Sequence, residues 1–301
     1  MISSGYNRMM QRRDAALAYV LGCCDAMHNR SSATLRHRYQ DRDASNRALE
    51  RGAPHMSVHK RDTLAVALEL REAGKDVMVL IFADAERPGG CVHGGAGMQE
   101  ESLFRRTALF AHLTPDLYPI DAQDELLYAG AVDVLLREED PSTKVQGGVK
   151  LAFVACPGLK MPPLVAGHTR FLDEDAIVLT RKVDTILQTA CRHGHDAVVL
   201  GALGCGVFGG PVRHTAEIFR SCVDASRCCV NEVHFAVLGA AHSVFLDVMS
   251  CPAKIVENSK QPCVSDPHVT PSHMMATSEV EAKVEKEVEV SSLQRSDRRS
   301  Q

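Results

Sequence analysis

Four short apolar runs constrain the fold of this 301-residue chain more than any other feature. They are DVMVLIFAD (76–84), GVKLAFVACP (148–157), DAVVLGALG (196–204) and VHFAVLGAA (233–241), and AGAVDVLLRE (129–138) is a weaker fifth candidate. Apolar residues follow one another in these runs without polar alternation, which is typical of strands covered on both faces of a sheet. The sequence therefore predicts a sheet enclosed between two other layers.

Stretches with helical periodicity separate most of these strands. They span residues 99–113, 174–192 and 213–227, and a further stretch over residues 61–74 ends at Gly74. A glycine directly after the last apolar position is a common end of a helix. Buried strands that alternate with helices predict an α/β domain with three layers, α/β/α, around a largely parallel sheet.

The two ends of the chain differ from this domain in composition. Residues 9–52 are polar, rich in Arg, Asp and Ala, and helical in pattern, so we expect an N-terminal helical extension over residues 1–56. The α/β domain is assigned to residues 57–250. Beyond Ser250 the sequence turns to Pro, Ser, Lys and Glu, which predicts a disordered tail over residues 251–301 because little apolar surface is left to bury.

Charge and cysteine content restrict the class of protein. The 34 basic and 38 acidic residues nearly balance, which gives no global signal for binding to nucleic acid or membrane. The 11 cysteines lack a C-x-x-C motif and include adjacent pairs, which suits a reducing compartment. No apolar segment reaches the roughly 18 residues of a membrane span, and residues 9–24 resemble an amphipathic helix more than a signal peptide. We expect a soluble intracellular protein of the cytoplasm or the nucleus.

Two glycine-rich loops occupy corresponding places in the predicted domain. RPGGCVHGGAGM (87–98) lies between the strand that ends near residue 84 and the helix that begins at Gln99. GALGCGVFGGP (201–211) lies between the strand that ends at Leu200 and the helix that begins near Arg213. Glycine lets main-chain N–H groups approach an anion closely, and the start of a helix adds partial positive charge. Ligands of α/β sheets bind at the carboxyl ends of strands, so two anion cradles at one edge predict a diphosphate flanked by sugars.

Glu100 and Glu101 lie in the first turn of the helix that follows the first loop. Acidic side chains are favourable there for electrostatic reasons alone. Neighbouring residues of a helix project about 100° apart, so one carboxyl can face the ligand while the other braces the loop. A carboxyl beside a bound sugar can protonate a glycosidic oxygen and later deprotonate water. Sugar together with diphosphate indicates ADP-ribose.

Two of these residue groups also have other interpretations. Gly204-x-Gly206-x-x-Gly209 matches a dinucleotide-binding fingerprint, but the next strand ends AVLGAAH without the acidic residue that this fingerprint requires. Cys205 lies near a helix start that favours a thiolate, yet no His-Asp pair accompanies it.

Three further groups of polar residues have both a functional and a structural interpretation. Cys191, His193 and His195 lack the spacing of a metal site and fit the end of a helix better. His93 either contacts substrate or fills a turn, and the adjacent pair Arg105 and Arg106 either meets polymer phosphates or forms a solvated helix face.

The two loops also carry a family resemblance. FADAERPGGCVHGGAGMQEESLFRRTALF (82–110) resembles the signature of the poly(ADP-ribose) glycohydrolases, especially the compact microbial type, and LGALGCGVFGGPVRHTAEIF (200–219) is similar to their diphosphate-binding loop. TLAVALELREAGKDVMVL (63–80) looks like the helix and strand that precede the signature. The likeness extends over roughly residues 57–246.

The resemblance implies a macrodomain fold with a mixed sheet, and removal of terminal ADP-ribose units by hydrolysis of the ribose–ribose bond without metal or cofactor. Glu101 would be the catalytic acid and base, Glu100 would hold the leaving ribose and Gln99 would start the catalytic helix. Gly89 and Gly90 would contact the distal ribose. The diphosphate loop would be Gly204, Cys205, Gly206, Val207 and Phe208, with Phe208 pressing that ribose toward Glu101. The implied partner is poly(ADP-ribose) or an ADP-ribosylated protein, without direct binding to DNA or membrane, and we expect a monomer.

Two positions depart from the family pattern. Cys91 replaces the third glycine of a triplet, and Asp84 stands where the family usually has asparagine. A carboxylate offers the ligand an acceptor but no N–H₂ donor. Besides the hydrolase, the sequence therefore leaves open a recognition module that binds ADP-ribose ends without cleaving them.

Overall fold

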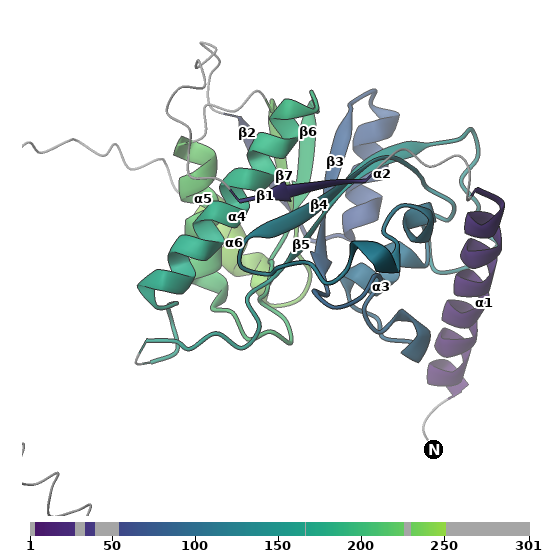
Figure 1. Ribbon diagram of the computed structural model, residues 1–301, viewed down its shortest axis with the longest axis horizontal. Coiled ribbons are helices and arrows are strands. Elements are labelled where there is room, and N and C mark those ends of the chain that lie inside the picture. The colour runs from purple at the N-terminus through teal and green to yellow at the C-terminus, as the bar shows by residue number, and fades with distance from the viewer. Residues whose placement is uncertain (1–3, 28–33, 40–53, 166, 226–229, 251–301) are drawn as a thin grey trace, which may run out of the picture. The chain divides into compact units, whose positions relative to one another are not determined.

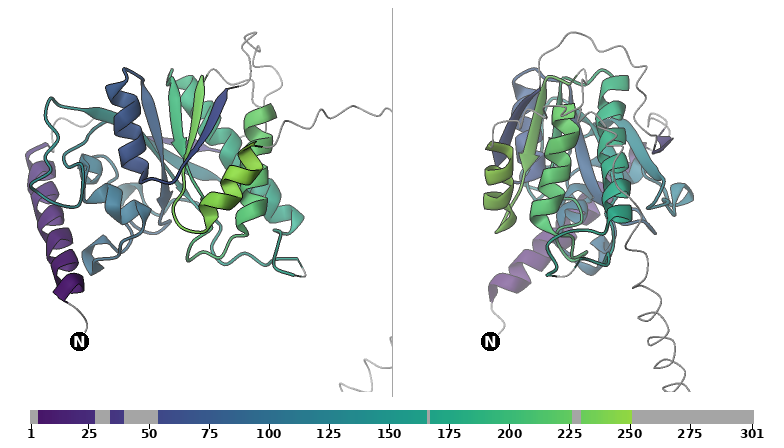
Figure 2. Two further views of the ribbon diagram at one scale, coloured as in Figure 1. Left: turned by 180° about the vertical axis from the view of Figure 1, so that it is seen from behind. Right: turned by 90° about the vertical axis from the view of Figure 1, so that its left-hand side faces the viewer.

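The apolar run after Asp76 forms β3 (Val77–Ala83), the central strand of a seven-stranded sheet with the order β1-β4-β5-β3-β6-β7-β2. The structure is a computed structural model that describes residues 4–27, 34–39, 54–165, 167–225 and 230–250. Helices cover both faces of the sheet (Figures 1 and 2). The other strands are β1 (Leu35–Arg38), β2 (His55–His59), β4 (Glu125–Asp133), β5 (Lys150–Pro157), β6 (Ala197–Leu200) and β7 (Glu232–Ala236). The predicted fold class is confirmed.

The helices divide between the two faces according to the cores to which they contribute. One core contains apolar residues of α1, α2, α3 and η2, and the other contains those of α4, α5 and α6. The α-helices are α1 (Ser4–Met27), α2 (Thr63–Glu72), α3 (Gln99–Phe104), α4 (Asp173–Arg192), α5 (Val212–Ala225) and α6 (Ala241–Ser250). Short 3₁₀ helices are η1 (Val92–Gly94), η2 (Ala108–Ala111) and η3 (Pro115–Leu117).

Strand β3 explains why the two cores require a continuous apolar run. Val77, Val79 and Ile81 belong to the first core, whereas Met78 and Leu80 belong to the second. Side chains of a strand alternate between the two faces, so a strand with a core on each side needs apolar residues at every position.

The directions of the strands place the loops that form the site. β3 pairs in parallel with β5 and β6, β6 pairs in parallel with β7, and β7 pairs in parallel with β2. On the side of the sheet beyond β5, β4 pairs with β5 and β1 pairs with β4, both antiparallel. The carboxyl ends of β3, β5, β6 and β7 therefore meet at one edge of the sheet, where both glycine-rich loops begin.

The N-terminal region was only partly predicted. Residues 4–27 form α1, which buries Ala16, Leu17, Val20 and Cys24 along one side in the first core. Residues 35–38, predicted to be helical, instead form β1, which pairs with β4 from Leu35↔Tyr128 to Arg38↔Glu125. Strand β2 pairs with β7 from His55↔Glu232 and was also not predicted. The remainder of the predicted extension and the predicted disordered tail lie outside the described residues.

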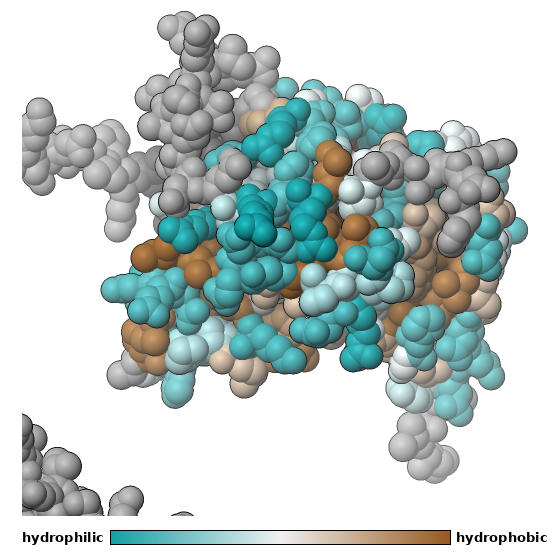
Figure 3. Space-filling model, viewed as in Figure 1, coloured by the Kyte–Doolittle hydropathy of each residue, from teal (hydrophilic) through white to brown (hydrophobic). Residues whose placement is uncertain are grey.

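The predicted helix over residues 99–113 is divided. α3 ends at Phe104, and η2 follows after a short connection. Among the described residues no helix is long and apolar enough to cross a membrane. Figure 3 shows hydrophobic residues at several places on a face that is otherwise largely hydrophilic. Tyr6 and Met9 of α1 are exposed.

Candidate functional site

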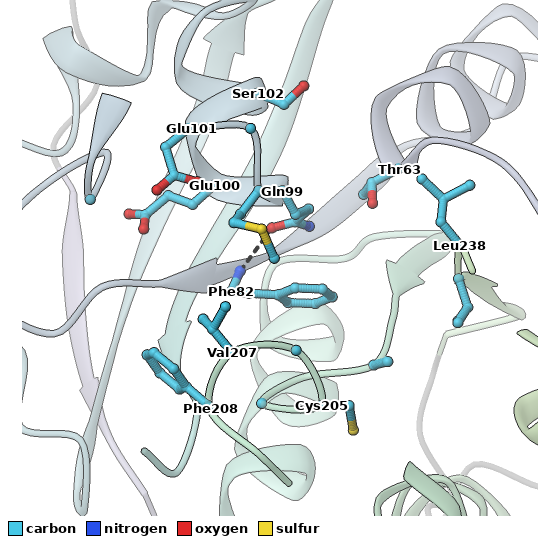
Figure 4. Close-up of a pocket in the computed structure, with 18 of the residues that line it drawn as sticks. Thr63, Phe82, Gln99, Glu100, Glu101, Ser102, Cys205, Val207, Phe208 and Leu238 are labelled. Carbon is cyan, nitrogen blue, oxygen red and sulfur yellow. Dashed lines mark hydrogen bonds between the residues drawn. The ribbon is translucent and has the colours of Figure 1, made fainter. Parts of the chain in front are cut away.

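A pocket of about 630 Å³ opens at the carboxyl ends of the parallel strands. It brings together the loops after β3, β5, β6 and β7 and the first turns of α2 and α3. Figure 4 shows Glu100 and Glu101 at one end, Thr63 and Leu238 at the other, and Cys205, Val207 and Phe208 along one side. Eleven of the twelve residues predicted for the site line it: Asp84, Gly90, Cys91, Gln99, Glu100, Glu101, Gly204, Cys205, Gly206, Val207 and Phe208. Gly89 is not among the lining residues.

The two glutamates are buried and hold the first glycine loop. Glu100 accepts hydrogen bonds from the main-chain N–H groups of Asp84 (2.8 Å) and Gly89 (3.1 Å), one on each carboxyl oxygen. Glu101 accepts one from the N–H of Cys91 at 3.2 Å through Oε1. Oε2 of Glu101 has no hydrogen-bond partner among the described residues, although the residue is only 7% exposed. The free acceptor of the pair therefore belongs to Glu101.

The environment of Glu100 favours its neutral form. Burial raises the pKa of Glu100 to about 8, and the negative charges of Glu101 and Asp84 act in the same direction, against the opposing hydrogen bonds from the main chain. Like charges this close resist ionising together. Glu100 can therefore hold a proton near neutral pH.

Gln99 joins the start of α3 to the central strand. Its side-chain Oε1 accepts a hydrogen bond from the N–H of Phe82 at 2.9 Å, and its Nε2 donates to the carbonyl of Leu80 at 2.6 Å. At this level β3 still pairs with β5 but no longer with β6, since the register with β6 ends at Val79. The amide thus supplies two hydrogen bonds that a neighbouring strand would otherwise provide.

The glycines of the first loop fit closely around the carboxylates. Gly89 and Gly90 have φ angles of 71° and 51°, which L-residues with side chains rarely adopt. A Cβ at residue 90 would lie 3.0 Å from both Glu100 Oε2 and Glu101 Oε1. A Cβ at residue 89 would lie 3.0 Å from the ring of Phe104. Both positions therefore require glycine, because of their φ angles and because neighbouring side chains approach them closely.

The first loop does not present the anion cradle that the sequence predicted. Seven of its N–H groups are already used: Gly89 and Cys91 donate to the glutamates, and Gly90, Val92, Gly94, Gly95 and Ala96 donate to carbonyls within the loop. An acidic side chain, rather than an external anion, occupies the donors that the glycines expose.

The second loop leaves its donors open. Within the part of the chain that the structure describes, no acceptor pairs with the N–H groups of Gly206, Val207 and Phe208, which line the pocket. Gly204 has φ 74°, and it packs so closely on Gly158 that a Cβ at residue 158 would come within 2.9 Å of its Cα. Consecutive free N–H groups in a loop that leads to a helix form a suitable site for a diphosphate.

The two departures from the family pattern have distinct surroundings. Oδ1 of Asp84 accepts hydrogen bonds from the N–H groups of Glu86 (2.7 Å) and Arg87 (3.1 Å), so this carboxylate closes the turn that starts the loop. Cys91 has φ −98°, a conformation that does not require glycine, and its side chain is exposed. Neither residue disturbs the hydrogen bonds of the glutamates.

Helix α1 is tied to the same loop. Arg13 donates to the carbonyl of Gly95 at 2.9 Å and pairs with Glu139 at 2.8 Å. Glu139 also pairs with Arg105, which donates to the carbonyl of Ala96 at 2.7 Å. The segment between the first loop and α3 is therefore held from both sides.

Arg105 and Arg106 are not the phosphate contacts or the solvated face that the sequence suggested. Arg105 is 0% exposed and Arg106 is 4% exposed. Arg106 forms two hydrogen bonds of 2.9 Å with the carboxylate of Asp62, the N-cap of α2. These arginines join α3 to its neighbours.

The competing readings of Cys205 and the histidines find no support. Burial raises the pKa of the Cys205 thiol to about 11, which disfavours a nucleophilic thiolate. His193 and His195 lie just after α4, and His195 is hydrogen-bonded to Tyr128 and Asp76, each at 3.0 Å. Among the described residues no group of His, Cys, Asp and Glu is arranged to hold a metal ion.

Sequence reasoning missed the apolar end of the pocket. Phe82, Val237, Leu238 and Ala241 line it there, and Leu238 is 62% exposed. These residues come from strand ends and loops without a polar motif, so only the sheet order β3-β6-β7 brings them together. Met98 and Val207 are further exposed apolar residues of the lining. A ligand with an apolar ring would cover this surface.

Comparison with known proteins shows what this chain is similar to. Residues 24–132 match the family described as microbial-type PARG, catalytic domain, where PARG stands for poly(ADP-ribose) glycohydrolase. No curated protein matches the chain.

Solved structures agree with the family match. The poly(ADP-ribose) glycohydrolase of Thermomonospora curvata is 27% identical with a TM-score of 0.63, over 79% of this chain and 99% of that chain. Its structure with the inhibitor ADP-HPD gives 28% identity and a TM-score of 0.62, over 79% and 98% of the two chains. The Deinococcus radiodurans enzyme in complex with ADP-ribose, at 24% identity, has a TM-score of 0.61 over 75% and 96% and supports the fold. The family resemblance and the enzyme class, a glycosidase, are confirmed.

Proposed function

We propose that this protein, with the catalytic-domain signature and fold of the poly(ADP-ribose) glycohydrolases, removes ADP-ribose units from the end of poly(ADP-ribose) by hydrolysing the ribose–ribose bond. The observation that carries the proposal is the free, buried Oε2 of Glu101 at the end of the pocket where the first glycine loop lies. The other oxygen of this carboxyl, Oε1, approaches Gly90, and both oxygens of Glu100 already accept hydrogen bonds, so Glu101 is the one of the two glutamates that keeps an unpaired oxygen for a sugar at Gly90.

The open amides and the apolar end support a position for the rest of the ligand. The diphosphate binds the N–H groups of Gly206, Val207 and Phe208 beside the start of α5. Adenosine then lies toward Phe82 and Leu238, whose apolar surfaces suit an adenine ring. Phe208 and Gly90 enclose the distal ribose. Binding of the remote diphosphate and adenosine thus positions the bond that reacts.

Two proton transfers at Glu101 complete the reaction. Protonated Glu101 gives its proton to the glycosidic oxygen as the bond from that oxygen to the anomeric carbon breaks, and the next unit leaves as an alcohol. The sugar carries oxocarbenium character, which the nearby carboxyl groups stabilise. Ionised Glu101 then takes a proton from the water that attacks the anomeric carbon, which restores the starting carboxylic acid. Glu100 holds the loop and the leaving ribose.

The direct test is Glu101→Gln, which keeps the shape of the side chain but cannot transfer the proton. Release of ADP-ribose from labelled polymer should fall by about 10²–10⁴-fold, the usual contribution of acid–base catalysis. Calorimetry should show ADP-ribose affinity close to that of the wild type. Glu72→Gln, an exposed glutamate paired with Arg137 away from the pocket, is the matched control and should keep full activity. Unchanged activity of Glu101→Gln would exclude this role.

A second candidate function is recognition of ADP-ribose ends without cleavage. The carboxylate of Asp84 favours it, because this side chain offers the ligand hydroxyls only an acceptor. Wild-type protein that binds ADP-ribose in calorimetry but releases none from the polymer would select this function over the hydrolase.

A further inference from the structure

A second hollow adjoins the pocket on the far side of the first glycine loop. It has a volume of about 590 Å³ and shares Gly90 and Cys91 with the first pocket. Since the N–H of Cys91 donates to Glu101, this boundary is also the place where the acid–base carboxyl is held. A bond broken at Glu101 would thus have one hollow on each side.

We propose that the second hollow binds the adenosine diphosphate part of the next unit of the polymer, the group that leaves in the reaction. This inference rests on the proposed hydrolysis of poly(ADP-ribose). In the ribose–ribose linkage the departing oxygen belongs to the adenosine ribose of the next unit, so an adenine ring and a diphosphate lie directly beyond it. The first pocket cannot also bind these groups, because the adenosine and the diphosphate of the terminal unit already occupy its apolar end and its free amides.

Aromatic and apolar residues of the hollow suit the adenine ring. The rings of His93 and Phe110 lie with their centroids 6.0 Å apart and their planes tilted by 41°, and Pro88 and Leu21 add apolar surface from the loop and from α1. His93 is exposed, whereas Phe110 is anchored by an edge-to-face contact with Phe104 at 4.8 Å. An adenine ring stacked on such a platform gains affinity through its π-face.

Arg87 suits the diphosphate. Its main-chain N–H is fixed by Asp84 at 3.1 Å, so the residue is anchored at the start of the loop. Its exposed guanidinium forms no ion pair within the described ranges of the chain. Glu86 adds an exposed carboxylate to the same wall, so the phosphates are expected on the Arg87 side. Arginine matches phosphate oxygens with two parallel hydrogen bonds.

The test compares leaving groups. We measure kcat/KM of wild type, Arg87→Gln and His93→Ala on the polymer and on ADP-ribose that carries 4-nitrophenol at the reacting carbon, whose small leaving group cannot reach Arg87. Arg71→Gln is the control, because Arg71 is an exposed arginine of α2 that bonds the carbonyl of Lys75 at the opposite edge of the sheet. We expect Arg87→Gln to lose about 10-fold on the polymer, as for a hydrogen bond to a charged group, and less than about twofold on the nitrophenyl substrate.

A binding experiment separates this inference from the proposed function. In the Glu101→Gln background, a two-unit oligomer should bind more tightly than ADP-ribose, and adding Arg87→Gln should remove the advantage. Failure of the wild type to cleave polymer would overturn the hydrolase, while the oligomer advantage would still support the hollow.

Three results would overturn the inference. Equal loss on both substrates would place the effect of Arg87 in the first pocket. The absence of loss on the polymer, together with equal affinity for the oligomer and ADP-ribose, would leave the hollow without this ligand. With an ADP-ribosylated peptide as a third substrate, a loss confined to that peptide would assign the hollow to protein acceptors instead.

Discussion

The two glycine-rich loops have similar composition but opposite hydrogen-bond arrangements. In the first loop, the N–H groups of Gly89 and Cys91 are bound by Glu100 and Glu101, and the glycines let the chain pass close to those carboxyls. In the second loop, the N–H groups from Gly206 to Phe208 remain open to the pocket. The first loop therefore orients acid–base groups, and the second receives a ligand. Glycine content by itself does not distinguish these two tasks.

Gly90→Ala should have the largest effect, because it should displace the two glutamates that the first loop positions. The added Cβ would lie 3.0 Å from an oxygen of each glutamate, at a residue with φ 51°. A shift of about 1 Å in a catalytic group can cost about 100-fold in rate, so kcat on the polymer should fall by at least that factor. ADP-ribose affinity, measured by calorimetry, should change by less than about 10-fold because the second loop is untouched. A variant with normal kcat would show that the loop does not position the glutamates.

Gly158→Ala should affect the second loop in the converse way. Its Cβ would come within 2.9 Å of Gly204 Cα and displace the loop that holds the open N–H groups. Loss of one hydrogen bond to a charged group costs about 1.5–3 kcal/mol, so ADP-ribose affinity should fall by about 10- to 100-fold. Turnover at saturating substrate should fall much less. Equal losses in kcat and affinity would mean that the two loops act as one unit.

The pH dependence of stability, compared between the wild type and Glu100→Gln, tests whether Glu100, which holds the first loop, is neutral in the folded protein. The pKa of this buried carboxyl in the folded protein, about 8, lies above its ordinary value of 4.5. Its contribution to stability is therefore full below the ordinary value and is lost as pH rises through about 8. Between about pH 5 and pH 8.5, the free energy of unfolding should drop by a few kcal/mol more in the wild type than in Glu100→Gln, at about 1.4 kcal/mol per pKa unit.

Urea denaturation of both proteins at the two pH values measures this difference. Other titrating groups are common to both, so they cancel in the comparison. Parallel pH dependence of wild type and Glu100→Gln would show that the carboxyl is ionised in the folded protein.

Cys91→Gly should have the smallest effect. Its φ of −98° suits any residue, and its N–H still holds Glu101 in the variant. If the thiol crowds the sugar, the variant should bind ADP-ribose or turn over polymer up to a few-fold better, by about 0.5–1 kcal/mol. Steady-state kinetics with Cys91→Ser as a size-matched control tests this. No gain would mean that the loop accommodates the side chain.

Sequence patterns predicted the parts of the molecule in which composition and conformation are tightly linked. β3, β5, β6 and β7 were found because strands buried on both faces need unbroken apolar runs. β1 and β2, with the sequences LRHR and HMSVH, lie at the sheet edges and lack that pattern. Their place depends on pairing with β4 and β7, which no local signal records.

The candidate site also has parts that the sequence predicted and parts that it did not. The glycines, the glutamates and their order along the chain indicated a sugar diphosphate, because few chemistries need these residue types together. The burial of Arg105 and Arg106 was not predicted, since adjacent arginines on a short helix look like a solvated face until Glu139 and Asp62 are placed beside them. The apolar end at Phe82 and Leu238 depends on strand order alone.

The amide of Gln99 has a consequence for the mobility of the enzyme. Because it is hydrogen-bonded to Phe82 and Leu80 of the central strand, α3 is expected to move with the sheet as one rigid piece. Any closure around a substrate must then come from the opposite wall, the segment from Gly204 to Phe208, where Val207 is 73% exposed. In such an arrangement the acid–base group stays still and the lid travels toward it.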